Sequence, residues 1–158
     1  MTGLIATVLP DEDTPAPPPI SNDGFFPDID PGMFRDQHRI REAVTPARAR
    51  EALVAAMLTV GRDLAAWGAR HRATGINRLE SVPAPTIDGT STLILLYRRA
   101  VFTAAKAEVV ERYRDVDLTS VGQRKVEDLE PSVSELRRDS LYAIRDMLAV
   151  GRITVELI

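Results

Sequence analysis

The chain has 158 residues, about one domain's length, and its 44% hydrophobic and 27% charged residues are ordinary for a globular protein. It contains no cysteine, which excludes disulfides, thiolate metal sites and a cysteine nucleophile. Residues 1–30 carry six acidic and no basic side chains, so the rest of the chain holds all 20 basic residues and 17 of the 23 acidic ones. A body so nearly balanced in charge argues against a dedicated binder of duplex DNA.

Residues 1–24 are expected to form an extended N-terminal arm. Seven of the eleven prolines lie in residues 1–31, including the run PAPPP at 15–19. Because proline fixes φ and donates no backbone hydrogen bond, this stretch should be extended or polyproline-like. It contains too little apolar surface to offset the entropy of ordering by itself.

Two helices are predicted next in the chain. Asp-Pro at 30–31 and Thr-Pro at 45–46 each place an N-cap residue before a proline in the first helical position. We expect helices from these points to about residues 40 and 73, with Gly75 ending the second. The second helix has its apolar side chains three or four positions apart, at Ala49, Leu53, Met57, Val60, Leu64 and Trp67.

A third helix is predicted over residues 89–114, after a proline-punctuated connection at 81–89. Its apolar face comprises Leu93, Leu96, Tyr97, Ala100, Val101 and Ala104. The longest dense apolar run, residues 93–97, stops at Arg98 and Arg99 and is far shorter than the roughly 20 residues of a membrane span. We therefore expect no contact with a membrane.

A fourth helix is predicted from Pro131, as its first residue, to about Val150. Its apolar side comprises Leu136, Ser140, Ala143, Ile144, Met147 and Leu148. The last residues, 152–158, alternate and are β-branched, as in a short strand. The predicted fold is therefore all-α, a small four-helix bundle over residues 25–151 with the N-terminal arm and a β-prone C-terminal tail.

A calcium loop is the first chemical site to consider. Asp115, Asp117 and Thr119 fit its first, third and fifth ligand positions, but Ser120 replaces the required glycine and Val126 the required glutamate. A turn capped by Asp and Thr side chains explains this stretch better.

The histidines and short motifs of the chain do not indicate a catalytic site. His38 and His71 are the only histidines, each is followed by an arginine, and neither belongs to an HExxH pattern. The chain also lacks GxSxG, GxxxxGK[ST] and GxGxxG. We expect no catalytic, metal or cofactor-binding residues and no enzymatic activity.

The candidate partner interface lies in the two extensions. Phe25 and Phe26, followed by Pro27, could anchor in a pocket of a partner, or could instead pack on their own helices. The β-prone tail could add a strand to a neighbour. The tail side chains proposed for this are Ile153, Val155, Leu157 and Ile158. Trp67 is expected in the core, with an exposed interface as the alternative.

The third helix is rich in basic residues. One interpretation is a phosphate-facing surface, and the other is a charged outer face balanced by Glu108 and Glu111 at helical spacing. The basic residues that could face DNA are Arg98, Arg99, Lys106, Arg112 and Arg114.

Five segments in order carry a resemblance to a known family. They are FFPDID from residue 25, TPARAREALVAAMLTVGRDLAAW from 45, LYRRAVFTAAKAEVVERYRD from 96, QRKVEDLEP from 123 and RRDSLYAIRDMLAVGRITVEL from 137. Together they resemble the head completion, or head stabilisation, proteins of P2-like tailed phages, the gpL family. The resemblance covers nearly all of residues 24–158, and the proline-rich leader lies outside it.

The resemblance implies a structural protein of the virion without cofactors. Such proteins join the head after DNA packaging, dock below the portal, form a ring in the head–tail neck and keep the DNA inside until the tail attaches. The implied partners are the twelve-fold portal ring, further copies of the chain, the next neck or tail-terminator protein, and packaged DNA contacted without sequence specificity. Assembly is expected in the bacterial cytoplasm.

Two alternatives stay open at this point. A small helical DNA-binding protein, such as a terminase small subunit, would need a recognition helix with polar residues near its start. The third helix begins instead with the apolar TSTLILL at residues 90–96. The other alternative is a scaffold or adaptor protein unrelated to phages.

Overall fold

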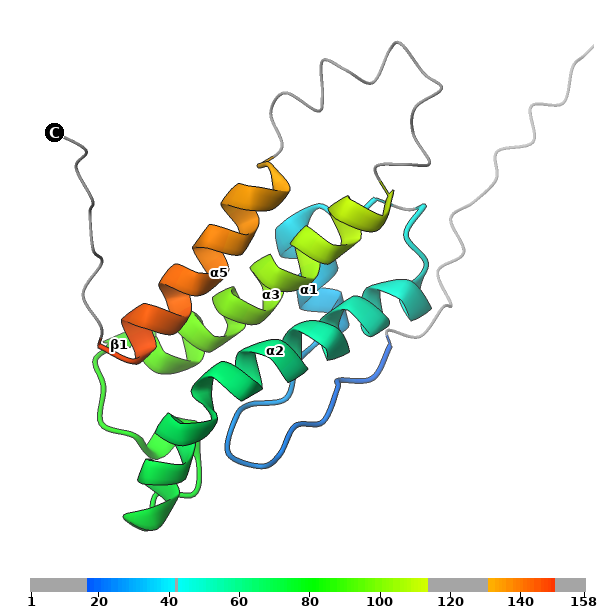
Figure 1. Cartoon of the computed structure of the whole chain (residues 1–158). Coiled ribbons are helices and arrows are strands. Elements are labelled where there is room, and N and C mark those ends of the chain that lie inside the picture. The colour runs from blue at the N-terminus through cyan, green and yellow to red at the C-terminus, as the bar shows by residue number, and fades with distance from the viewer. Residues whose placement is uncertain (1–16, 42, 114–130, 150–158) are drawn as a thin grey trace, which may run out of the picture.

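The computed structural model describes residues 17–41, 43–113 and 131–149, and these residues are mainly helical (Figure 1). The predicted all-α fold is confirmed only as a mainly helical one, because the structure also contains a small antiparallel hairpin. The elements in chain order are α1 (Pro31–His38), α2 (Pro46–Ala73), the 3-10 helix η1 (Leu79–Ser81), β1 (Thr86–Ile87), β2 (Thr90–Ser91), α3 (Thr92–Tyr113) and α5 (Val133–Met147).

The three long helices run side by side, with α3 between α2 and α5 (Figure 1). Ion pairs join the start of α2 to the end of α3, and the end of α3 to the start of α5, so neighbouring helices are antiparallel. The pairs are Glu51–Arg112 at 3.2 Å and Glu111–Arg137 at 2.6 Å. Helix α1 has only eight residues and packs on α2 and α3. The finer prediction of a four-helix bundle is therefore not confirmed.

Local capping explains where the helices begin. Asp30 and Thr45 cap α1 and α2 through their side chains, with proline at the first helical position, as predicted. The predicted start of the last helix is wrong by two residues. Ser132 is its N-cap and forms a reciprocal capping box with Glu135, so Pro131 lies outside the helix.

The start of α3 also differs from the prediction, because residues 86–91 form a hairpin. Asp88 and Gly89 make its two-residue turn with φ of 50° and 71°. Positive φ at both central residues matches a type I′ turn, for which Asp-Gly is a favoured pair. The Asp-Gly pair is present in the sequence, although residues 81–89 are predicted there as a plain connection. Because the hairpin occupies residues 86–91, α3 begins at Thr92 rather than near residue 89.

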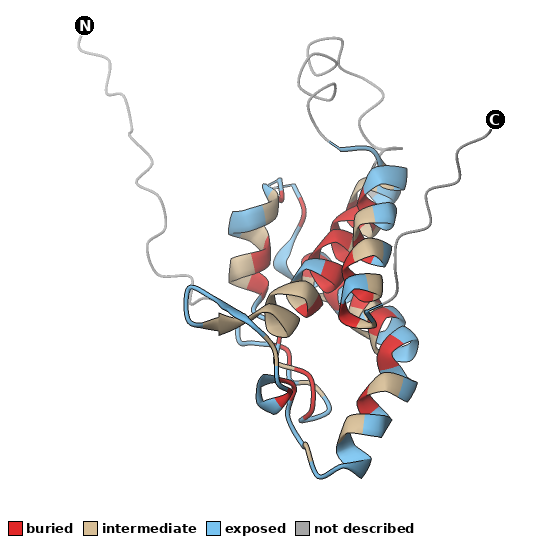
Figure 2. Ribbon diagram, turned by 90° about the vertical axis from the view of Figure 1, so that its left-hand side faces the viewer, coloured by how far each residue is buried: buried red, intermediate tan, exposed pale blue. Residues whose placement is uncertain are grey.

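The buried side chains line the inner faces of the helices (Figure 2). The apolar faces predicted for α2 and α5 are confirmed, with Met57, Trp67 and Leu148 half-buried. On α3 the buried surface is wider than predicted, because Phe102, Ala105 and Val109 are also buried, whereas the predicted Leu93, Leu96 and Ala104 are half-buried. Besides these faces the core contains aromatic side chains from three elements, among them Phe34, Tyr97 and Phe102. The packed body begins at Ile20, which is buried and exchanges two backbone hydrogen bonds with Ile29.

Helix α2 carries apolar residues on more than one side. It has 28 residues and contains an 18-residue window of mean hydropathy 1.2, so by length and composition alone it meets the minimum for a membrane crossing. The prediction of no membrane span rested on the run at 93–97 and did not include this window. The core-facing stripe of α2 packs on α3, and 39% of the window is buried.

Three predicted features lie outside the described residues. They are residues 1–16 of the arm, the Asp-rich stretch from residue 115, and the β-prone tail at 152–158.

Candidate interaction surfaces

The loop at residues 20–30 is fixed by its own side chains. The Asp23 carboxylate accepts hydrogen bonds from the backbone N–H groups of Phe25 and Phe26, at 2.9 and 3.0 Å, and forms an ion pair with Arg72 of α2. The amide Nδ2 of Asn22 donates to the Tyr97 hydroxyl at 2.7 Å. These contacts bind the loop to both α2 and α3.

Both phenylalanines of this loop are buried in their own subunit, at 2% and 6% exposure. The Phe25 ring meets Trp67 edge-on at 6.2 Å and lies under the Arg72 guanidinium at 4.8 Å. The Phe26 ring stacks on Tyr97 at 4.8 Å. The arrangement considered as the alternative, packing on the chain's own helices, is the one that this structure contains. Pro27 is half-buried beside them.

The polar groups under this loop have shifted pKa values. Burial raises the pKa of Asp23, but the hydrogen bonds from Phe26, Arg72 and Phe25 outweigh it and leave the pKa below its usual value. Burial raises the pKa of Tyr97 to about 12, against the opposing effect of the Asn22 hydrogen bond. The folded loop therefore favours an ionised Asp23 and a neutral Tyr97.

The basic residues of α3 do not form one free surface. Lys106 is buried, at 6% exposure, so it cannot contact a phosphate in this conformation. Arg99 lies 3.7 Å from Asp139, and Arg112 is paired with both Glu51 and Glu108. Arg98 is half-buried and has no ion pair within the described residues, and Arg114 lies outside them. Two of the five predicted basic residues, Arg99 and Arg112, are thus paired with carboxylates.

The two histidines are packed against aromatic rings. His38 lies 5.6 Å from Phe34 and 5.5 Å from Phe102, and burial together with the Lys106 charge lowers its pKa. His71 meets Trp67 at 4.3 Å. Within the described residues no three His, Cys, Asp or Glu side chains gather as metal ligands would.

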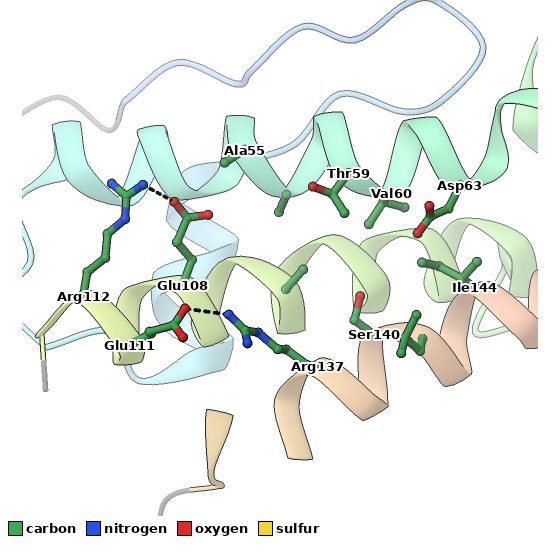
Figure 3. Close-up of a pocket in the computed structure, with 13 residues that line it drawn as sticks. Ala55, Thr59, Val60, Asp63, Glu108, Glu111, Arg112, Arg137, Ser140 and Ile144 are labelled. Atoms are coloured by element: carbon green, nitrogen blue, oxygen red, sulfur yellow. Dashed lines mark hydrogen bonds and ion pairs between the residues drawn. The ribbon is translucent and has the colours of Figure 1, made fainter. Parts of the chain in front are cut away.

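A groove of about 480 Å³ runs along α3 between α2 and α5 (Figure 3). It exists because α2 and α5 each pack on α3 but make few contacts with each other. Ala55, Ala56, Val60, Ala104, Leu141 and Ile144 supply its apolar lining. Asp63 lies beside Ile144 at one end, and the ion pairs of Arg112 and Arg137 lie at the other.

A second hollow is lined only by residues of α5 and its N-cap. Its lining contains Arg137, Arg138 and Arg145 together with Leu141 and Tyr142, and no carboxylate. Arg138 lies over the Tyr142 ring at 5.8 Å. This face was not predicted, although residues 137, 141 and 145 recur at the i, i+4 spacing that marks one side of a helix.

Large apolar side chains remain exposed on the helices that flank the groove. Val54 and Leu58 on α2 are 39% and 68% exposed, and Leu141 on α5 is 54% exposed. Of these three, Leu141 lines the groove, whereas Val54 and Leu58 lie on α2 outside its lining. An exposed apolar side chain in a groove is typical of an interaction site rather than of a reaction centre.

Comparison with protein families matches residues 20–158 to the family described as phage head completion protein (GPL). The chain belongs to this family. The match begins where the packed body begins, at Ile20, and leaves the proline-rich leader outside. The family resemblance found in the five segments of the sequence is thereby confirmed.

Two head completion proteins show the same relationship over most of their length. The head completion/stabilization protein of Escherichia phage P2 is 38% identical over 141 residues, which cover 89% of this chain and 83% of the P2 protein. The probable head completion/stabilization protein of Haemophilus phage HP1 (strain HP1c1) is 29% identical over 139 residues, or 88% and 91% of the two chains. No solved structure matches the chain.

Membership of this family gives the broad function. The chain is a structural head completion protein of a tailed phage and a component of the virion, and the family is not one of enzymes. Nothing in these comparisons favours the terminase alternative.

Proposed function

We propose that this head completion protein joins the DNA-filled head at the portal, as a ring of identical copies in the neck, and retains the DNA until the tail attaches. The single observation that carries the proposal is the family match over residues 20–158. A protein that works by occupying a place in an assembly needs surfaces rather than reactive groups. The exposed apolar side chains of α2 and α5 supply such surfaces.

The loop at residues 20–30 has an indirect part in this proposal. Phe25 and Phe26 hold the loop on α2 and α3, and the loop then presents Pro27 with the exposed Asp28 to a neighbour. The leader reaches the packed body at Pro18, whose carbonyl accepts a hydrogen bond from Arg50 of α2 at 3.1 Å. From this point the stiff proline run could reach an adjacent subunit or the portal.

Contact with packaged DNA is proposed for the arginines that stay at the surface. These are Arg98 and Arg99 at the start of α3, Arg112 near its end, and Arg138 and Arg145 on α5. Because most of them have acidic neighbours, each would add little affinity, and the DNA could pass without tight binding. Such contact would weaken as salt is raised.

Infection with a phage that lacks this gene tests the proposal. We expect heads that contain cut, packaged DNA, lose it on standing and carry no tails. Supplying the wild-type gene from a plasmid is the control, and it should restore tailed particles. Empty shells with uncut DNA would instead indicate a role in packaging and would favour the terminase alternative.

A further inference from the structure

We propose that the groove between α2 and α5 is the binding site for the chain's own C-terminal segment, residues 152–158, in the same subunit. This replaces the interpretation in which Ile153, Val155, Leu157 and Ile158 add a strand to a neighbour. The inference concerns the isolated subunit and does not depend on the proposed place in the neck.

The first argument is position. Helix α5 ends at Met147, and the last described residue after it, Ala149, has φ of 54°. A residue in this left-handed region ends a helix with a sharp turn, and alanine adopts it far less readily than glycine. The chain therefore leaves α5 by a turn at the end of the helix that lies nearest Asp63 and Ile144 in the groove (Figure 3).

The second argument is length. Along α5 the groove extends from Arg137 to Ile144, which is about 10 Å at 1.5 Å per residue. Residues 153–157 in extended form span about 13 Å between their first and last Cα atoms. Residues 150 and 151, the latter a glycine, supply the connection. The segment thus matches the groove without stretching.

The third argument is chemistry. Ile153, Val155 and Leu157 alternate with Arg152, Thr154 and Glu156, so an extended segment has one apolar and one polar face. The lining of the groove is mostly alanine, valine, leucine and isoleucine, and small side chains there let a backbone approach closely. The apolar face would cover Leu141, which is otherwise 54% exposed.

Charge fixes the direction of the segment. Asp63 is exposed at the end of the groove nearest α5's exit and forms no ion pair within the described residues. Arg152 follows Ala149 by three positions and comes to that end first. The acids at the far end already have partners, because Glu108 pairs with Arg112 and Glu111 with Arg137. Asp63 is the carboxylate left for Arg152.

Engineered cysteines test the inference, because the natural chain contains none. A variant with Leu141→Cys and Val155→Cys should form a disulfide under mild oxidation, which peptide mass spectrometry detects. The matched control combines Val155→Cys with Gln37→Cys, an exposed site on α1. We expect the first pair to cross-link at least about 10-fold faster, since docking raises its effective concentration. Equal rates would overturn the proposal.

Mixing isotope-labelled with unlabelled protein distinguishes docking within one subunit from docking on a neighbouring copy. Nitrogen-15-labelled Leu141→Cys protein is mixed with unlabelled Val155→Cys protein and oxidised. Cross-linked peptides of mixed isotope should stay minor relative to those of the double variant. If they form as fast, the segment docks on another copy and the proposal is wrong.

A charge exchange tests the direction. Asp63→Arg should slow the Leu141–Val155 cross-link about threefold, the scale of an exposed ion pair. Adding Arg152→Asp should restore the rate. If the double exchange stays as slow as Asp63→Arg alone, the segment does not lie in the proposed direction.

Discussion

Replacing Phe26 by alanine measures how much the loop at 20–30 contributes to the fold. The side chain is 6% exposed, stacks on Tyr97 at 4.8 Å and meets Phe25 edge-on at 5.0 Å. Removing a buried phenylalanine costs about 3–5 kcal/mol, because transfer free energy is lost and a cavity remains. A cost of about 4 kcal/mol corresponds to a melting temperature lower by about 8–16 °C for a chain of this size.

Urea unfolding at 25 °C, followed by far-ultraviolet circular dichroism and by Trp67 fluorescence, measures this loss. Trp67 is the only tryptophan and lies 6.2 Å from the Phe25 ring, so it reports on the loop directly. The matched control is Leu58→Ala, at a side chain that is 68% exposed, where we expect a change below about 0.5 kcal/mol. The reasoning is refuted if Phe26→Ala unfolds within about 1 kcal/mol of wild type while head completion is lost, because Phe26 would then serve a partner.

Three smaller predictions concern titration and capping. The neutral Tyr97 side chain should stabilise the folded protein fully below pH 10, and this stabilisation should be lost as the pH rises towards its folded pKa of about 12. In urea unfolding, Tyr97→Phe should remove this loss of stability at alkaline pH. Asp23, whose pKa is lowered from 3.8, should stabilise the folded protein above about pH 4, and this stabilisation should disappear on acidification. Asp23→Asn should make the free energy of unfolding depend less on pH in the acidic range. Ser132→Ala removes the N-cap of α5 and should cost about 1 kcal/mol, whereas Ser134→Ala on the same turn should cost much less.

Local sequence rules predicted most of the helices. Capping by Asp30 and Thr45 and the three-to-four spacing of apolar residues are properties of a few neighbouring positions, so they can be read without a fold. The start of α5 was misplaced because Pro131 and the Ser132–Glu135 capping box give competing signals two residues apart. The hairpin was missed because its strands have only two residues each.

The environment of single side chains was harder to predict. Lys106 looked exposed in a basic stretch, but α3 lies between other helices and is covered on several sides, so one apolar stripe does not describe its burial. The place of Phe25 and Phe26 depended on whether Trp67 and Tyr97 would meet them, which only the tertiary structure determines.

The groove could not be predicted for a similar reason. It arises from the spacing of α2 and α5 on α3, and its lining residues come from three separate helices. The family resemblance, in contrast, is carried by five sequence segments in order and does not depend on how the helices pack.

A reconstruction of the neck of the purified virion tests the central claim most directly. We expect several copies of the α2–α3–α5 body arranged around the DNA channel directly below the portal. Particles that complete their heads and attach tails with no such density at the neck would contradict it.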